Sequence, residues 1–210
     1  DNTVSQGLII SATNVNEALS LSSTLVSNSF AETSVVGATI ATSSATDPEN
    51  ATISYTLSGI GSDKFSVSSD GTVTLSSSLD YESTTSYNLT LTASDGTNST
   101  NSSFTVSVTN VNEAPTLSST IVASSFSEST TVGTTIANYS SSDPESSSIT
   151  YSLSGADSGK FSIASDGTLT LSSSLDYETK DTYNVVINVS DGDNTVSQGL
   201  IISATNVNEA

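Results

Sequence analysis

The chain has 210 residues, with 22 Asp and Glu against 3 Lys and Arg, no His and no Cys, and its formal net charge is −19. This charge excludes nucleic acid and anionic membrane surfaces as partners, because binding phosphate groups requires cationic side chains. Without His or Cys there is no zinc site, disulfide or His-activated nucleophile, and we expect no enzyme. No apolar run approaches the ~20 residues of a membrane span, so we expect no membrane insertion.

Ser and Thr make up 81 of the 210 residues, which together with the acidity would suit a disordered chain. The order of the residues argues against disorder. Apolar residues alternate with Ser and Thr through much of the chain, as in Phe104-Thr105-Val106-Ser107-Val108. This period of two predicts half-buried strands. Since only three prolines occur and no long segment has a 3.6-residue period, we predict almost no helix.

The chain opens with a segment that it repeats at its far end. Residues 1–18 are identical to residues 193–210, and the motif Asn-Val-Asn-Glu-Ala begins at Asn14, Asn110 and Asn206, 96 residues apart. We interpret residues 19–114 and 115–210 as two full repeats. Residues 1–18 are then the last strand and linker of a preceding repeat, so the sequence predicts a longer tandem array.

Each repeat has the length and strand spacing of a β-sandwich. In the first repeat the predicted strands are 21–29, 34–42, 51–58, 64–68, 72–76, 86–94 and 103–111. Ser69-Asp70-Gly71 favours a tight turn between two of them, and Asp95-Gly96 favours another turn. About seven short strands in about 96 residues predict an all-β, two-sheet Greek-key sandwich of the immunoglobulin-like kind. Val36 is among the side chains that we expect in its core.

The carboxylates recur as pairs at matched positions. Asp47/Glu49 and Asp80/Glu82 each place two carboxylates on one side of an extended segment, ~6.6 Å apart. The second repeat has the same pairs as Asp143/Glu145 and Asp176/Glu178. Few lysines are present to neutralise them, so either protonation or a bound cation must offset the repulsion. Oxygen ligands without His or Cys select a hard cation, and Ca²⁺ accepts six to eight oxygens.

These motifs resemble cadherin repeats, in the divergent form found in tandem arrays of bacterial surface proteins. A Glu after the first strand appears as Glu32 and Glu128, and a late Asp appears as Asp95 and Asp191. The Asp-Arg-Glu motif appears as Asp80-Tyr81-Glu82 and Asp176-Tyr177-Glu178. The Asp-X-Asp motif appears as Asp47-Pro48-Glu49 and Asp143-Pro144-Glu145. The linker motif appears as residues 110–115.

The resemblance implies Ca²⁺ sites at the junction between consecutive repeats. For the complete junction it implies the ligands Glu32, Asp80, Glu82, Asn110, Val111, Asn112, Glu113, Ala114, Asp143, Glu145 and Asp191. Half of an earlier junction would use Asn14, Asn16, Glu17, Asp47, Glu49 and Asp95. Half of a later one would use Glu128, Asp176, Glu178, Asn206, Asn208 and Glu209.

The linker departs from the family pattern in ways that bear on the number of ions. Asn110 stands where the family has Asp, and Ala114 stands where it has Asn. Because fewer charged ligands usually weaken Ca²⁺ binding, we expect two or three ions per junction.

The resemblance implies a structural function outside the cell. We expect a calcium-rigidified extender of a large surface adhesin or filament protein, located extracellularly or on a bacterial cell surface. Its partners would be adjacent repeats of the same chain and neighbouring copies in an assembly. Two alternatives remain open: a module that binds carbohydrate or protein directly, and a filament subunit that donates residues 7–12 as a strand to a neighbouring chain.

Overall fold

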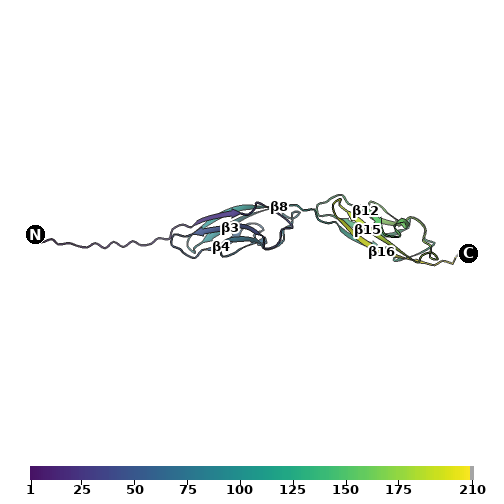
Figure 1. Ribbon diagram of the computed structural model, residues 1–210, viewed down its shortest axis with the longest axis horizontal. Coiled ribbons are helices and arrows are strands. Elements are labelled where there is room, and N and C mark those ends of the chain that lie inside the picture. Colours follow the sequence, from purple (N-terminus) through teal and green to yellow (C-terminus); the bar gives the residue numbers. More distant parts are fainter. Residues whose placement is uncertain (209–210) are drawn as a thin grey trace. The chain divides into compact units, whose positions relative to one another are not determined.

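The structure is a computed structural model, which describes residues 1–208. The chain divides into two compact units, residues 1–111 and residues 112–210. Each unit contains eight strands in two four-stranded sheets, drawn as paired layers in Figure 1. Within residues 1–208 the helical content is two short 3₁₀ turns, Ser62–Lys64 (η1) and Ser158–Lys160 (η2). The prediction of an all-β, immunoglobulin-like sandwich is confirmed.

In the first unit the sheets have the strand orders β1-β3-β6-β5 and β2-β8-β7-β4. The strands are Ser20–Leu25 (β1), Ser29–Ala31 (β2), Thr39–Thr46 (β3), Ser54–Ser58 (β4), Phe65–Val67 (β5), Thr72–Leu75 (β6), Ser86–Ser94 (β7) and Ser99–Thr109 (β8). All pairs are antiparallel except β2 with β8, which run parallel.

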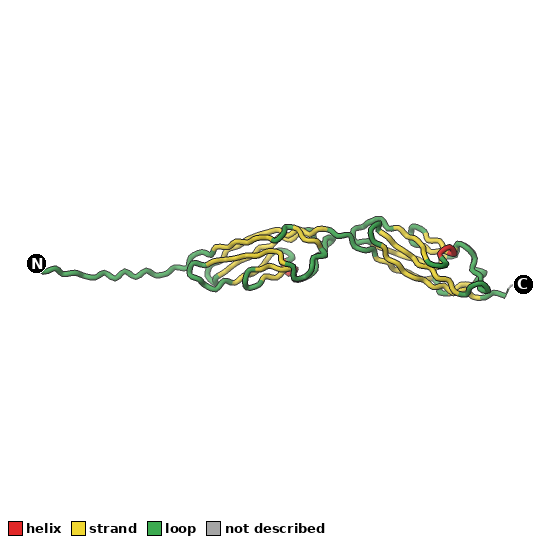
Figure 2. Tube along the Cα trace, in the orientation of Figure 1, coloured by secondary structure: helices red, strands yellow, loops and turns green. Residues whose placement is uncertain are grey.

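The second unit repeats this topology, with the orders β13-β14-β11-β9 and β10-β16-β15-β12. Its strands are Thr116–Ile121 (β9), Ser125–Ser127 (β10), Thr135–Ser142 (β11), Thr150–Ser154 (β12), Phe161–Ile163 (β13), Thr168–Leu171 (β14), Thr182–Ser190 (β15) and Thr195–Thr205 (β16). The parallel pair here is β10 with β16. The two strand orders therefore correspond, and Figure 2 draws the strands of both units in yellow.

Each unit has its own core, built from the apolar members of the alternating strands. In β7, Leu89 and Leu91 are 1 % and 0 % exposed, while Thr90 between them is only partly buried. In β15, Val185 and Ile187 take the same positions. Removing these side chains from water is the main term that favours folding, at roughly 25 cal/mol for each Å² buried.

The structure corrects some details of the sequence interpretation. The strand predicted at 21–29 is two strands, β1 and β2, which belong to different sheets. The strand predicted at 34–42 begins later, at Thr39, because residues 32–38 form turns. The prediction of Val36 as a core residue is wrong: it lies in this turn region and is 59 % exposed.

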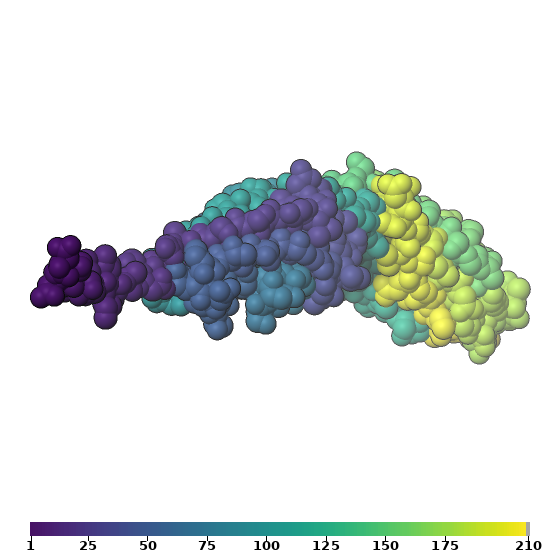
Figure 3. Space-filling view, turned by 60° about the vertical axis from the view of Figure 1, so that its left-hand side comes forward, coloured from purple at the N-terminus to yellow at the C-terminus, as the bar shows by residue number. Residues whose placement is uncertain are grey.

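The segment before β1 contains no strand, although its sequence is that of β16. Leu8 and Ile10 are 84 % and 83 % exposed, whereas the identical Leu200 and Ile202 are 6 % and 0 % exposed. The space-filling view shows the first residues, in dark purple, projecting from the rest of their unit (Figure 3). The difference follows from the partners of β16, which pairs with β15 and β10.

Replacing Gly167 by alanine should destabilise the second unit. Gly167 has a φ of +83°, and an added Cβ would lie 2.1 Å from the carbonyl oxygen of Tyr139. We expect Gly167→Ala to cost about 1–3 kcal/mol in free energy of unfolding, measured by urea denaturation. Gly199→Ala is the matched control, because no heavy atom outside residues 198–200 lies within 4 Å of that Cβ. Equal effects of the two substitutions would contradict this prediction.

Candidate metal centre

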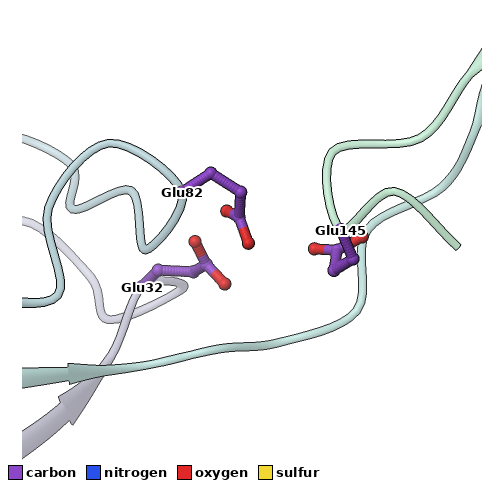
Figure 4. Close-up of side chains that lie close together, drawn as sticks. All are labelled: Glu32, Glu82 and Glu145. Carbon is purple, nitrogen blue, oxygen red and sulfur yellow. The ribbon is translucent and has the colours of Figure 1, made fainter.

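The first acidic group of unit 1 lies where two parallel strands end side by side. Because β2 pairs in parallel with β8, the carboxyl ends of both strands meet: Glu32 follows β2 and Val111 follows β8. The N–H groups of Val111 and Tyr81 donate to the two oxygens of Glu32, each at 2.7 Å. Carboxylate oxygens of Glu32 and Glu82 lie within 4.8 Å of one another, and Figure 4 draws both side chains.

Unit 2 builds the same group by itself. Glu128 follows β10, is 8 % exposed, and accepts hydrogen bonds from Val207 N–H at 2.5 Å and Tyr177 N–H at 2.8 Å. These two N–H groups hold the pKa of Glu128 below its ordinary value. One carboxylate oxygen each of Glu128, Asp176 and Glu178 lies within 4.8 Å of the others. Three carboxylates at this separation repel strongly unless a cation lies between them.

The second acidic group of each unit lies at its other end, beside the linker that enters the unit. In unit 1 the Asn16 amide donates to Asp95 at 2.8 Å, and Glu17 N–H donates to Glu49 at 3.2 Å. The Asn16 bond is the main reason that the pKa of Asp95 is lowered. The Glu49 carboxylate raises the pKa of Glu17.

The corresponding linker residues make the same bonds inside unit 2. The Asn112 amide donates to Asp191 at 2.9 Å, and Glu113 N–H donates to Glu145 at 3.4 Å. The backbone N–H of Asn194 is the main reason that the pKa of Asp191 is lowered.

Sequence reasoning missed two residues that position the linker. The Asn98 amide donates to the carbonyl oxygen of Glu17 at 2.9 Å, and the Asn194 amide donates to that of Glu113 at 3.2 Å. Each Asn also donates its backbone N–H to the Asp three positions earlier, at 2.6 Å. The recurrence of an Asn three residues after Asp95 and after Asp191 was the available signal.

Two buried oxygens provide the test of whether these residues suit a cation. Oδ1 of Asp47 accepts a hydrogen bond from Ala51 N–H, and Oδ1 of Asp143 accepts one from Ser147 N–H, both at 2.9 Å. The Oδ2 atoms of both Asp residues are buried without a hydrogen-bond partner within residues 1–208. An ionised oxygen buried without a partner is costly. A hard cation would satisfy it, so the donor set fits Ca²⁺.

Asn206 and Glu209 belong to the predicted later junction. The Asn206 amide donates to the Glu178 carboxylate at 2.6 Å. Glu209 lies outside the described residues. The ion pair recorded within residues 1–208 joins Lys180 to Asp157, neither of which is a predicted ligand. No helix among these residues is long and apolar enough to span a membrane.

Comparison with known protein families identifies the fold. The sequence profile of the Cadherin domain matches residues 27–111 and 123–203. The chain belongs to the cadherin domain family. Cadherin domains are extracellular, are typically non-enzymatic adhesion modules, and generally bind Ca²⁺ at the junctions between domains. No curated protein matches the chain by sequence.

Solved cadherin structures resemble this one. Human protocadherin-24 EC1-2 (Form II) is 26 % identical with a TM-score of 0.58, over 84 % of this cadherin chain and 93 % of that one. The protocadherin gammaB7 EC3-6 cis-dimer structure is 25 % identical with a TM-score of 0.57, over 87 % and 46 %. Drosophila N-cadherin EC1-4, at 23 % identity and a TM-score of 0.55 over 85 % and 47 %, shares the fold.

Acidification of the metal-free cadherin chain should lower its melting temperature. The pKa of Asp70 is lowered by hydrogen bonds from Ser68 and Thr72, and that of Asp166 by the N–H of Thr168. The stability that each contributes is fully present above the ordinary value of 3.8 and is lost as the pH falls through the lowered folded-state pKa. We expect Asp166→Asn to reduce this dependence below about pH 4, measured by calorimetry in EDTA. An unchanged pH profile would contradict the assignment.

Proposed function

We propose that this chain is a calcium-rigidified extender of a long extracellular protein, supporting adhesion. The observation that carries the proposal is the recurrence of oxygen-only acidic groups at both ends of each unit, with unpartnered buried oxygens at Asp47 and Asp143. Two domains joined by a short linker reorient freely without metal. Ca²⁺ bound by both domains and by the linker fixes their relative orientation.

The proposed junction uses ligands from three parts of the chain. The first repeat contributes Glu32, Asp80 and Glu82, and the second contributes Asp143, Glu145 and Asp191. The linker contributes side chains of Asn110, Asn112 and Glu113 with carbonyl oxygens of Val111 and Ala114. Seven of these residues are carboxylates, so a charge of −7 faces the +6 of three Ca²⁺ ions, and two or three ions are proposed for the junction.

The remaining ligands belong to junctions with further repeats. We propose that residues 1–18 are the tail of a preceding repeat and that the full repeats are 19–114 and 115–210. The identity of 1–18 with 193–210 supports this division. Asn14, Asn16, Glu17, Asp47, Glu49 and Asp95 then serve the earlier junction, and Glu128, Asp176, Glu178, Asn206, Asn208 and Glu209 serve the later one. We place the array on a bacterial cell surface, where extracellular Ca²⁺ saturates even weak sites.

Small-angle X-ray scattering with and without Ca²⁺ tests the proposed stiffening. In Ca²⁺ the scattering should fit one arrangement of the two units, and in EGTA it should require a broad ensemble. Isothermal titration calorimetry gives the number of ions. The double variant Asp143→Asn/Asp191→Asn is the control that should remain flexible in Ca²⁺. Identical scattering of the unsubstituted protein in both buffers would refute the extender function.

The exposed segment before β1 favours a second candidate function. Leu8 and Ile10 are almost fully exposed there, although the same sequence forms a buried strand as β16. In an assembly this segment could pair with the open sheet edge of a neighbouring copy. Light scattering of the chain separates the two functions, because a strictly monomeric chain at all concentrations excludes strand donation.

A further inference from the structure

The two repeats differ at a pair of positions that form an ion pair beside the acidic loop of repeat 2. Repeat 2 has Asp157 and Lys180 where repeat 1 has Gly61 and Thr84. The Lys180 ammonium lies 2.7 and 2.8 Å from the two carboxylate oxygens of Asp157. The Asp157 side chain is 11 % exposed and the Lys180 side chain 39 %. A charge-assisted pair at this burial is better defined than an exposed surface pair.

The ion pair anchors the loop that carries Asp176 and Glu178. Asp157 also accepts a hydrogen bond from Asn184 N–H in β15 at 2.7 Å, so it is fixed to the sheet. Lys180 closes the loop: it forms an antiparallel bridge with Asp176, and its N–H donates to the Asp176 carbonyl oxygen at 2.9 Å. The loop from 176 to 180 is therefore held at its end by a residue paired with the core sheet.

Tyr183 adds a second anchor at the other end of the same loop. Its hydroxyl accepts a hydrogen bond from Asp176 N–H at 2.9 Å and donates to the Asp176 carbonyl oxygen at 3.1 Å. The Lys180 ammonium lies 5.8 Å from the centre of the Tyr183 ring, within the range of a cation–π contact. Asp157, Lys180 and Tyr183 thus form one connected support beneath Asp176.

Repeat 1 has the loop without this support. Thr84 N–H still donates to the Asp80 carbonyl oxygen, at 3.0 Å. Gly61 and Thr84 cannot form an ion pair, and within residues 1–208 no bridge joins Asp80 to Thr84 and no bond joins the Tyr87 hydroxyl to Asp80. The two loops carry the same carboxylates on differently anchored backbones.

We propose that Asp157 and Lys180 are positioning residues that preorganise the repeat-2 carboxylates for Ca²⁺, so that the two repeats present calcium sites of unequal affinity. This inference rests on the proposed calcium function. A loop that is already ordered loses less conformational entropy when the ion binds. The lysine charge opposes this only weakly, because the Asp157 carboxylate neutralises it at 2.7 Å.

The direction in which Lys180→Thr changes the Ca²⁺ affinity separates positioning from charge repulsion. If Lys180 acted only as a repelling charge, Lys180→Thr would tighten Ca²⁺ binding at Glu128, Asp176 and Glu178. The proposal requires the opposite: about tenfold weaker binding, the scale of a lost outer contact to a metal site. Lys180→Arg keeps the ion pair and should retain near-normal affinity. Asp157→Asn/Lys180→Thr leaves the net charge unchanged and should weaken binding as much as Lys180→Thr.

The experiment uses the full chain with two readouts. Terbium luminescence, sensitised by nearby tyrosines and displaced by Ca²⁺, reports affinity, and the phase lost in Glu178→Gln identifies the repeat-2 site. Amide hydrogen exchange in EDTA reports loop order without metal, and exchange at residues 177–180 should accelerate in Lys180→Thr but not in Lys180→Arg. A calorimetric scan confirms that each variant is folded.

Each outcome decides the inference. Weaker terbium binding with faster loop exchange supports positioning by Lys180. Unchanged or tighter binding, or unchanged exchange in EDTA, overturns it while leaving the calcium function intact. If the terbium titrations of the unsubstituted chain and of Glu178→Gln are the same, no ion binds at this cluster. The calcium function of the cluster then fails, and the inference fails with it.

Discussion

Transfer from a calcium buffer to EGTA is expected to lower the melting temperature of the chain by roughly 10–20 °C for each domain that loses an ion. An ion that binds only the folded state at 100 times its dissociation constant stabilises it by about 2.7 kcal/mol. One kcal/mol shifts the melting temperature of a domain of this size by about 4–8 °C. The carboxylates of Glu128, Asp176 and Glu178 supply a second contribution, because removal of the ion restores their repulsion.

Differential scanning calorimetry measures this shift, with Mg²⁺ as the first control. Mg²⁺ demands a small octahedral site and keeps its water, so it should restore little of the stability. The matched control variant is Glu32→Gln/Glu128→Gln, which keeps the side-chain volume and removes one charge from each carboxyl-end group. Its melting curves in Ca²⁺ and EGTA should lie much closer together. Superimposed curves for the unsubstituted chain would show that calcium contributes nothing to folding.

Ile187→Ala is expected to destabilise unit 2 by about 2–5 kcal/mol, the usual cost of truncating a fully buried aliphatic side chain. Ile187 is 0 % exposed and belongs to the core of unit 2, which is separate from that of unit 1. The substitution should therefore lower the urea midpoint of the unfolding transition of unit 2 and leave the midpoint of unit 1 unchanged. Urea denaturation followed by amide exchange assigns the transitions to the units.

Ile201→Ala is the control for this core prediction. Ile201 lies in the neighbouring strand of the same sheet but is 62 % exposed, so its truncation removes little buried surface. We expect its effect to stay within about 0.5 kcal/mol. Comparable losses from the two isoleucines, or equal destabilisation of both units by Ile187→Ala, would contradict the description of two independent cores.

The sequence by itself determined the repeat, the all-β class of the fold and the residue types of the candidate sites. The motif at Asn14, Asn110 and Asn206 is visible without coordinates, and the alternation in 86–94 predicted strand β7 with its observed bounds. The pairs Asp80/Glu82 and Asp176/Glu178 were recognisable as a repeated motif, but the prediction that they lie on extended segments is wrong, because residues 81–83 and 177–179 form turns. These features are local, so a linear pattern is enough to reveal them.

Tertiary structure decided what depends on distant parts of the chain. The predicted strand 21–29 splits between two sheets, which places Glu32 beside the end of β8, and Asn98 and Asn194 become linker contacts only when the domain closes. Residues 3–13 and 195–205 have one sequence and two structures. Only the second copy has β15 and β10 beside it, because a strand needs partners for its backbone hydrogen bonds and a second sheet to cover its apolar face.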